Sequence, residues 1–221
     1  MSNKSAGHPA GYVFIVVVFI VACVILSIAF TPKKEPLIVE PTIEFLQPTE
    51  ILPNSISQNV LLDVPLLGQL PEYPAGCEAA SVAMMVSYAG HPEAVSDIIA
   101  MMPYSDDPYL GYVGDPKNPR GYTIFPSGMS VVVEEIMGTS EDLSGLTLDT
   151  LEWYLRDNRP VAVWLGYGAL PGTTIHCVTL TGFDEENVYY NDPYTYIKDT
   201  KMSKVRFKQL WSEFGNKALS Y

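Results

Sequence analysis

The sequence predicts an α+β fold in which a group of helices precedes an antiparallel sheet. Two observations support this. Before Pro160 the apolar residues recur mainly at helical spacing, whereas after it they gather in short β-branched or aromatic runs separated by turn residues. The chain of 221 residues is also 48% hydrophobic, enough for one well-cored domain with an appendage. Helices and strands segregated in this way are typical of α+β domains.

The folded part is expected to begin near Val60 with a short extended stretch, which leads to a buried helix. Residues 78–89 read EAASVAMMVSYA and lack a polar face, so this helix should be buried on nearly all sides. Gly90 and Pro92 end it, because glycine suits a left-handed cap and proline cannot continue a helix.

Three more helices are predicted from apolar stripes and capping residues, around 95–102, 129–137 and 148–157. Thr147 provides an N-cap for the last of these. The intervening stretch, 104–128, is rich in glycine, proline and tyrosine. Loops of that length are usually functional walls or lids.

The strand predictions follow Pro160 in the chain. They cover 161–165, 175–183, 187–192 and a segment near 195–199. A last helix is expected over 204–214, because Phe207, Leu210, Trp211 and Phe214 share one face. The closing KALSY is expected to return as an edge strand of the antiparallel sheet.

The N-terminal region contains an apolar run. Residues 12–30 read YVFIVVVFIVACVILSIAF, close to the length of about 20 residues that crosses a bilayer as a helix. We expect an uncleaved transmembrane helix or signal anchor there. The alternatives are signal cleavage at Ser27 and Ala29, and lipidation of Cys23.

The apolar run separates two segments of different character. Residues 1–11 form a short N-terminal tail, and residues 31–58 are proline-rich, which is typical of an extended, semi-rigid spacer. The folded domain is then expected over residues 59–221.

The charge of the chain excludes one class of function. Thirteen Lys and Arg residues against 25 Asp and Glu give a formal net charge of −12. A nucleic-acid binder needs a basic face to neutralise phosphates, so no nucleic-acid partner is expected.

The stretch LPEYPAGCEAA places a cysteine at the mouth of the buried helix. A thiolate at a helix N-terminus is stabilised by the helix dipole, so the pKa of Cys77 is expected to be lowered. Such a nucleophile needs a base, and histidine suits this task at neutral pH. His8 precedes the apolar run and His91 lies in a helix exit, which leaves His176 as the candidate.

A third group must orient the imidazole. A hairpin of IHCVTLTGF and NVYYNDP brings Asp192 close to the strand residues 176–179. Asn191 is the rival, since an amide can also orient a histidine. Side-chain alternation lets one of the two face the ring, and Asp192 is favoured.

Other residues complete this set of candidates. Gln69 can supply a side-chain amide to an oxyanion hole. Cys177 should point away from the neighbouring histidine as a small core residue. A Cys77–Cys177 disulfide is the structural alternative, because it accounts for both thiols without catalysis.

The order of these motifs is similar to that of a known family. Gln69, GCEAAS, HCVTLTGF and YYNDP together resemble the papain-like cysteine peptidases, and most closely the stand-alone relatives of the double-glycine leader peptidases fused to bacteriocin exporters. The likeness extends over roughly residues 60–221. The papain pattern places its glutamine nearer to the cysteine than the eight residues found here.

The resemblance implies a papain-like fold and a Cys77–His176–Asp192 triad, with Gln69 in the oxyanion hole. It implies peptide or protein substrates and no metal or organic cofactor. It also implies a bacterial protein that is either a single-pass membrane protein with an extracytoplasmic domain or, after cleavage near Ala29, secreted. We expect a monomer. The alternative function is a catalytically silent surface binding module.

Two predictions concern the long loop. Its tyrosines are candidates to line the substrate groove. The groove candidates are Tyr112 and Tyr122 of this loop, together with Trp164 of the predicted strand 161–165. Its acidic residues lack the regular spacing of calcium ligands in an EF-hand, so no metal site is predicted.

Overall fold

The computed structural model describes residues 59–221 of the chain. The predicted tail at 1–11, membrane segment at 12–30 and spacer at 31–58 lie outside these residues. Within the described part, no helix has the length and apolar character needed to cross a membrane.

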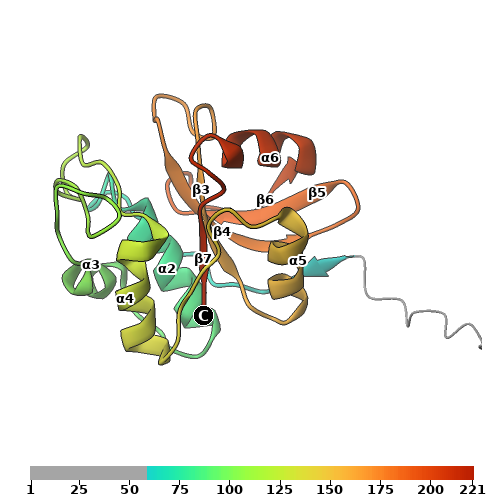
Figure 1. The fold of residues 1–221 in the computed structure, drawn as a ribbon, viewed down its shortest axis with the longest axis horizontal. Helices are drawn as coiled ribbons and strands as arrows, with labels where there is room; N and C mark the ends of the chain where they lie inside the picture. Colours follow the sequence, from blue (N-terminus) through green and yellow to red (C-terminus); the bar gives the residue numbers. More distant parts are fainter. Residues whose placement is uncertain (1–58) are drawn as a thin grey trace, which may run out of the picture. The chain divides into compact units, whose positions relative to one another are not determined.

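An antiparallel sheet forms the centre of the described part (Figure 1). Its strands are β1 (Val60–Leu61), β2 (Glu141–Asp142), β3 (Val161–Leu165), β4 (His176–Phe183), β5 (Asn187–Asp192), β6 (Ile197–Ser203) and β7 (Ala218–Ser220). The strand order is β2-β7-β3-β4-β5-β6, and β1 pairs with β4. The structure thus confirms the predicted antiparallel sheet, and β3 and β5 have the predicted bounds.

The helices precede and flank the sheet. They are α2 (Cys77–Tyr88), α3 (Val95–Met101), α4 (Pro126–Met137), α5 (Leu148–Arg156) and α6 (Lys204–Ser212). Thr147 caps α5 by accepting a hydrogen bond from the backbone N–H of Thr150, as predicted. Helix α4 begins three residues earlier than predicted, because Pro126 occupies its first turn, where a missing N–H costs nothing.

One prediction about the sheet is wrong. Strand β7 is not an edge strand, because β2 pairs with its outer side. Strand β2 has only two residues, so it shows no alternation that a sequence pattern could reveal. Strand β6 also runs further than predicted, to Ser203.

The core lies on both faces of the sheet. Helices α5 and α6 cover one face, and α2, α3 and α4 gather on the other (Figure 1). In β3, Val163 and Leu165 pack with the first group, while Ala162 and Trp164 pack with the second. This alternation follows from the two-residue period of a strand. The helices and the antiparallel sheet together confirm the α+β prediction.

Helix α2 is the buried central helix. The ten residues from Cys77 to Val86 are all buried, as the absence of a polar face predicts. Thr179 of β4 donates a hydrogen bond to the carbonyl of Ser81 at 3.0 Å, which fixes the helix on the sheet. This contact joins the first half of α2 to the middle of β4.

Candidate active site

Cys77 is the first residue of α2, one residue before the predicted start of the helix at 78. The turn before it is tight: a Cβ on Gly76 would lie 2.7 Å from the Cβ of Tyr73, closer than real Cβ contacts. The glycine that precedes the cysteine therefore lets the chain turn sharply into the helix. No side chain of the described residues caps this helix start.

His176 begins β4 and meets Asp192, the last residue of β5. The imidazole Nε2 lies 2.9 Å from Asp192 Oδ1, and both side chains are nearly buried, at 3% and 7% exposure. Because this contact occupies Nε2, Nδ1 is the nitrogen left for a thiol or a substrate. The sequence prediction that a β-hairpin brings these residues together agrees with this geometry.

The register of β4 and β5 explains why Asp192 is chosen. Thr179 lies opposite Asn191, so Asn191 shares the face of Thr179. Asp192 therefore falls on the other face, with His176. The side chain of Asn191 instead donates to the carbonyls of Val64, at 3.0 Å, and Pro65, at 3.3 Å.

The carboxylate of Asp192 is held by the backbone of the turn that follows it. Its Oδ1 accepts from the N–H groups of Tyr194, at 2.9 Å, and Thr195, at 3.2 Å. An aspartate before proline often closes a turn in this way. Burial alone would raise the pKa of Asp192, but His176 and the two N–H groups outweigh it and hold the pKa below its usual value.

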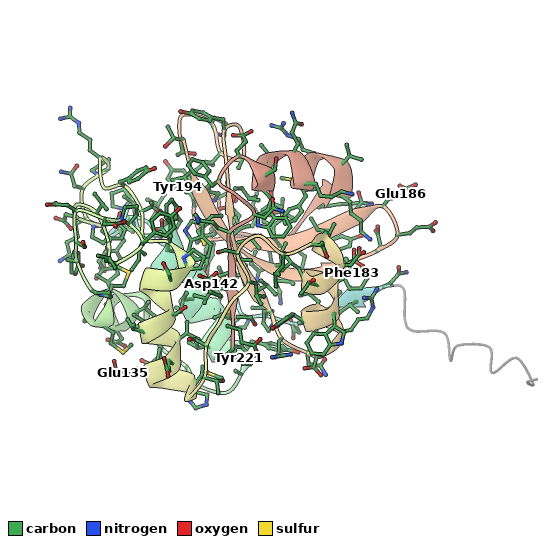
Figure 2. All side chains as sticks on the ribbon, viewed as in Figure 1. Glu135, Asp142, Phe183, Glu186, Tyr194 and Tyr221 are labelled. Carbon is green, nitrogen blue, oxygen red and sulfur yellow. The ribbon has the colours of Figure 1, made fainter. Side chains whose placement is uncertain are left out.

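A cavity of about 190 Å³ joins the candidate residues. Cys77, His176 and Gln69 all line it, together with parts of the loops at 119–122 and 170–175. Tyr194 also lines it and packs edge-on against the His176 ring, with 6.5 Å between ring centroids. Figure 2 labels Tyr194 near the end of the sheet where α2 begins. The structure thus brings the nucleophile, base and amide candidates to one hollow.

Gln69 is 2% exposed and lies in this cavity wall. Its Nε2 donates to the carbonyls of Tyr73, at 3.2 Å, and Pro74, at 3.0 Å. The amide therefore braces the turn before Cys77 in this structure. Its Oε1 is buried without a hydrogen-bond partner.

Two of the three groove candidates are not at the cavity. Tyr112 and Trp164 are buried, at 1% and 0% exposure. The Tyr112 hydroxyl donates to the carbonyl of Ala75, and Trp164 Nε1 donates to that of Ile124, so both rings brace the long loop from inside. Tyr122, by contrast, is 43% exposed and lines the cavity.

The electrostatic surroundings of Cys77 differ from the expectation. Burial and the adjacent Glu78 carboxylate raise the pKa of the thiol well above its ordinary value. The thiol donates a hydrogen bond to Glu78 Oε2 at 3.3 Å. Glu78 was not predicted as a site residue, although it is the one charged residue of the otherwise nearly apolar α2, which is a signal the sequence carries.

Cys177 follows His176 in β4. It is fully buried in the core on the α2 side of the sheet, as predicted. Cys77 and Cys177 are both free thiols in the structure, so the disulfide alternative does not hold there. Among residues 59–221, no cluster of three or more His, Cys, Asp or Glu side chains could hold a metal ion.

The chain is similar to several known proteins. The model of the peptidase C39-like family matches residues 61–219. The uncharacterised protein YvpB of Bacillus subtilis is 30% identical over 188 residues, which cover 72% of this chain and 74% of YvpB. The family match spans nearly all of the described residues.

Solved structures also resemble this chain. The crystal structure of a candidate C39-like peptidase from Bacillus anthracis superposes with a TM-score of 0.69 and 26% identity, covering 74% of this chain and 96% of that one. The peptidase domain of Streptococcus ComA, a bifunctional ABC transporter, gives a TM-score of 0.48 and 18% identity over 71% of this chain and 95% of that one.

Proposed function

Because this chain belongs to the peptidase C39-like family, we propose that it is a cysteine peptidase or amidase that hydrolyses peptide bonds through Cys77, His176 and Asp192. The observation that carries the proposal is the His176–Asp192 contact at 2.9 Å, in the wall of the cavity that Cys77 also lines. A buried carboxylate on one imidazole nitrogen leaves the other nitrogen as a base, as nucleophilic catalysis requires.

The first step forms an acyl-enzyme. His176 Nδ1 takes the proton of the Cys77 thiol, and the sulfur attacks the amide carbonyl carbon. The resulting oxyanion meets the backbone N–H at the start of α2. When the intermediate collapses, the C–N bond breaks, and the proton on His176 passes to the leaving amine. A thioester remains on Cys77.

The second step restores the enzyme. His176 takes a proton from water, the oxygen attacks the thioester carbonyl, and the acid departs as the proton returns to the sulfur. The buried Asp192 stabilises the imidazolium in both steps and keeps the ring in one orientation. Apart from the water molecule, every catalytic group in these steps belongs to the chain itself.

The cavity lining supports a neutral substrate group at the reacting carbonyl. None of its lining residues is Asp, Glu, Lys or Arg. A charged side chain would be desolvated there without a counter-charge, which costs free energy. The cavity is therefore proposed to accept uncharged side chains of peptide or protein substrates.

The remaining sequence predictions belong to the same proposal. Residues 12–30 would anchor the protein in the membrane, and the spacer would carry the peptidase domain on the extracytoplasmic side. Cleavage near Ala29 would give a secreted form instead. The domain is proposed to act as a monomer.

The test is hydrolysis of a peptide library by the full chain in mild detergent. We expect cleavage products from wild type and none from Cys77→Ala, with both proteins equally folded by circular dichroism. Iodoacetamide should alkylate Cys77, which lines the cavity, faster than the fully buried Cys177. Binding without cleavage, with equal and slow alkylation of both thiols, would instead indicate a silent binding module.

A further inference from the structure

Glu78 is a buried carboxylate that the proposed mechanism does not use. It is 0% exposed, although it directly follows Cys77 at the start of α2. The ion pairs formed within residues 59–221 do not include it. A carboxylate buried without a cation costs stability, so a role other than packing is the first possibility to consider.

Two side chains contact this carboxylate, one on each oxygen. The Cys77 thiol donates to Oε2 at 3.3 Å, and the Thr123 hydroxyl donates to Oε1. Thr123 is also 0% exposed and lies 45 residues away, in the loop before α4. The three residues form one buried chain of hydrogen bonds from this loop to the sulfur.

The same loop forms part of the cavity wall. Gly121 and Tyr122 line the cavity, and Thr123 follows them immediately in the chain. Residues that a substrate would touch are thus covalently continuous with the partner of Glu78. Cys77 thus shares the cavity with His176, which the hairpin positions, and donates a hydrogen bond to Glu78, which the loop holds through Thr123.

We propose that Glu78 is a positioning residue: with Thr123 holding one oxygen, its carboxylate keeps the Cys77 thiol protonated and in a resting hydrogen bond. In this state the thiol hydrogen is directed to Glu78 Oε2. The reaction then begins when this hydrogen bond is exchanged for one to His176. This role affects catalysis only if the chain is the cysteine peptidase proposed above.

The charges around Glu78 agree with this role. Burial raises the pKa of Glu78, whereas the hydrogen bonds from Thr123 and Cys77 and the proximity of His176 favour its charged form. Burial is the main reason why the pKa values of Cys77, of Cys177 on β4 and of Tyr112 in the loop are raised, and the charge of Glu78 raises them further. Within the described residues, the titratable groups that interact with Glu78 are thus Cys77, Cys177, Tyr112 and His176.

The test is the pH profile of iodoacetamide alkylation, read at the Cys77 peptide by mass spectrometry in the full chain without substrate. Glu78→Gln removes the charge and keeps the shape, so the profile should move to lower pH. Below the pKa, each unit of downward shift increases the thiolate tenfold, and the lower nucleophilicity reduces the net gain in rate to about threefold. Thr123→Val should shift the profile the same way but less, because it favours protonated Glu78.

The double variant separates this role from loosened packing. If Thr123 acts through Glu78, Glu78→Gln with Thr123→Val should match Glu78→Gln alone. Thr179→Val is the matched control: it also removes a buried threonine hydrogen bond to α2, at Ser81, without touching Glu78. Its profile should equal that of wild type.

Two results would overturn the proposal: an unchanged profile in a folded Glu78→Gln protein, or equal shifts in Thr123→Val and Thr179→Val. The second would indicate that packing alone sets the reactivity of the thiol. Because alkylation needs no substrate, a failure of the peptidase proposal would be seen separately, as unchanged hydrolysis by Cys77→Ala.

Discussion

His176 and Asp192 are 16 residues apart in the chain, yet their side chains meet at 2.9 Å between Nε2 and Oδ1. The β4–β5 hairpin brings them together, and the two backbone N–H groups after Asp192 fix the carboxylate. The imidazole is therefore oriented before any substrate arrives, which is the condition for efficient proton transfer.

Asp192→Asn should abolish most activity while the domain stays folded. The amide can occupy the same space, but it cannot stabilise the imidazolium and can favour the wrong tautomer. We expect kcat to fall by roughly two to four orders of magnitude. The measurement is the initial rate of peptide hydrolysis, with thermal melting as the check of folding.

Asp184→Asn is the matched control for this substitution. Asp184 also accepts backbone hydrogen bonds, from Glu186 and Asn187, but at the turn of the same hairpin. Its variant should melt earlier and keep its kcat. Equal losses of kcat in the two variants would contradict the orienting role of Asp192.

Asn191→Ala should show the opposite pattern. The amide satisfies two buried carbonyls, at Val64 and Pro65, and its Oδ1 accepts from the backbone N–H of Asp199 at 3.0 Å. Leaving these groups without partners should lower the free energy of unfolding by about 2–4 kcal/mol. Urea denaturation measures this loss, and kcat per folded molecule should change by less than it does in Asp192→Asn.

The hairpin shows how far sequence reasoning reaches. Side-chain alternation is a local rule, so it predicts that only one of Asn191 and Asp192 faces His176. The choice of Asp192 depends on the register shift between Leu180 and Gly182, which alternation alone does not predict. The start of α2 is equally local, because an apolar run after Gly76 marks it. These predictions needed no knowledge of distant segments.

The electrostatic state of the thiol depends on distant segments and was therefore mispredicted. The helix start favours a lower pKa, but burial and Glu78 raise it, and the loop that carries Thr123 helps to bury Glu78. The prediction that Tyr112 and Trp164 line the groove was wrong for a similar reason. Aromatic rings with a polar atom suit both a groove and a core, and only the packing of the loop decides between them.

The buried carboxylate predicts a pH-dependent stability. Burial raises the pKa of Glu78 in the folded chain above its unfolded value of about 4.3. The contribution of protonated Glu78 to the stability of the fold is thus complete below the unfolded pKa. It is lost as the pH rises through the folded pKa of Glu78. Glu78→Gln should therefore be more stable than wild type at pH 8, by about 1.4 kcal/mol for each pKa unit of the shift.

Thermal melting from pH 4 to 8 measures this difference. The gap between Glu78→Gln and wild type should widen with pH and vanish near pH 4. A gap that is constant across this range would mean that packing, and not ionisation, distinguishes the two proteins.

Tyr122 and Tyr112 should separate substrate binding from folding. Tyr122 lines the cavity, so Tyr122→Ala should raise KM about fivefold, the equivalent of about 1 kcal/mol, with a smaller effect on melting. Tyr112→Phe removes the hydrogen bond to the carbonyl of Ala75 and should cost about 1 kcal/mol of stability. Steady-state kinetics and urea denaturation of both variants check the pair, and a KM effect confined to Tyr112→Phe would refute it.

Gln69 presents two roles that one variant cannot distinguish. Its Nε2 donates to the carbonyls of Tyr73 and Pro74, so it braces the turn before Cys77. Its place in the cavity wall also suits an oxyanion donor, which would have to exchange one of these carbonyls for the oxyanion. Gln69→Ala removes both contributions.

Gln69→Glu resolves the two roles, because it keeps the length of the side chain and loses the amide donors. If Gln69 stabilises the oxyanion, both variants should lower kcat by about 10²–10³-fold with little change in KM. If it only braces the turn, kcat per folded molecule should stay within a few-fold of wild type, while both variants melt earlier. Measuring kcat, KM and melting together therefore assigns Gln69, because loss of an oxyanion donor acts on the transition state and loss of a brace acts on the folded state.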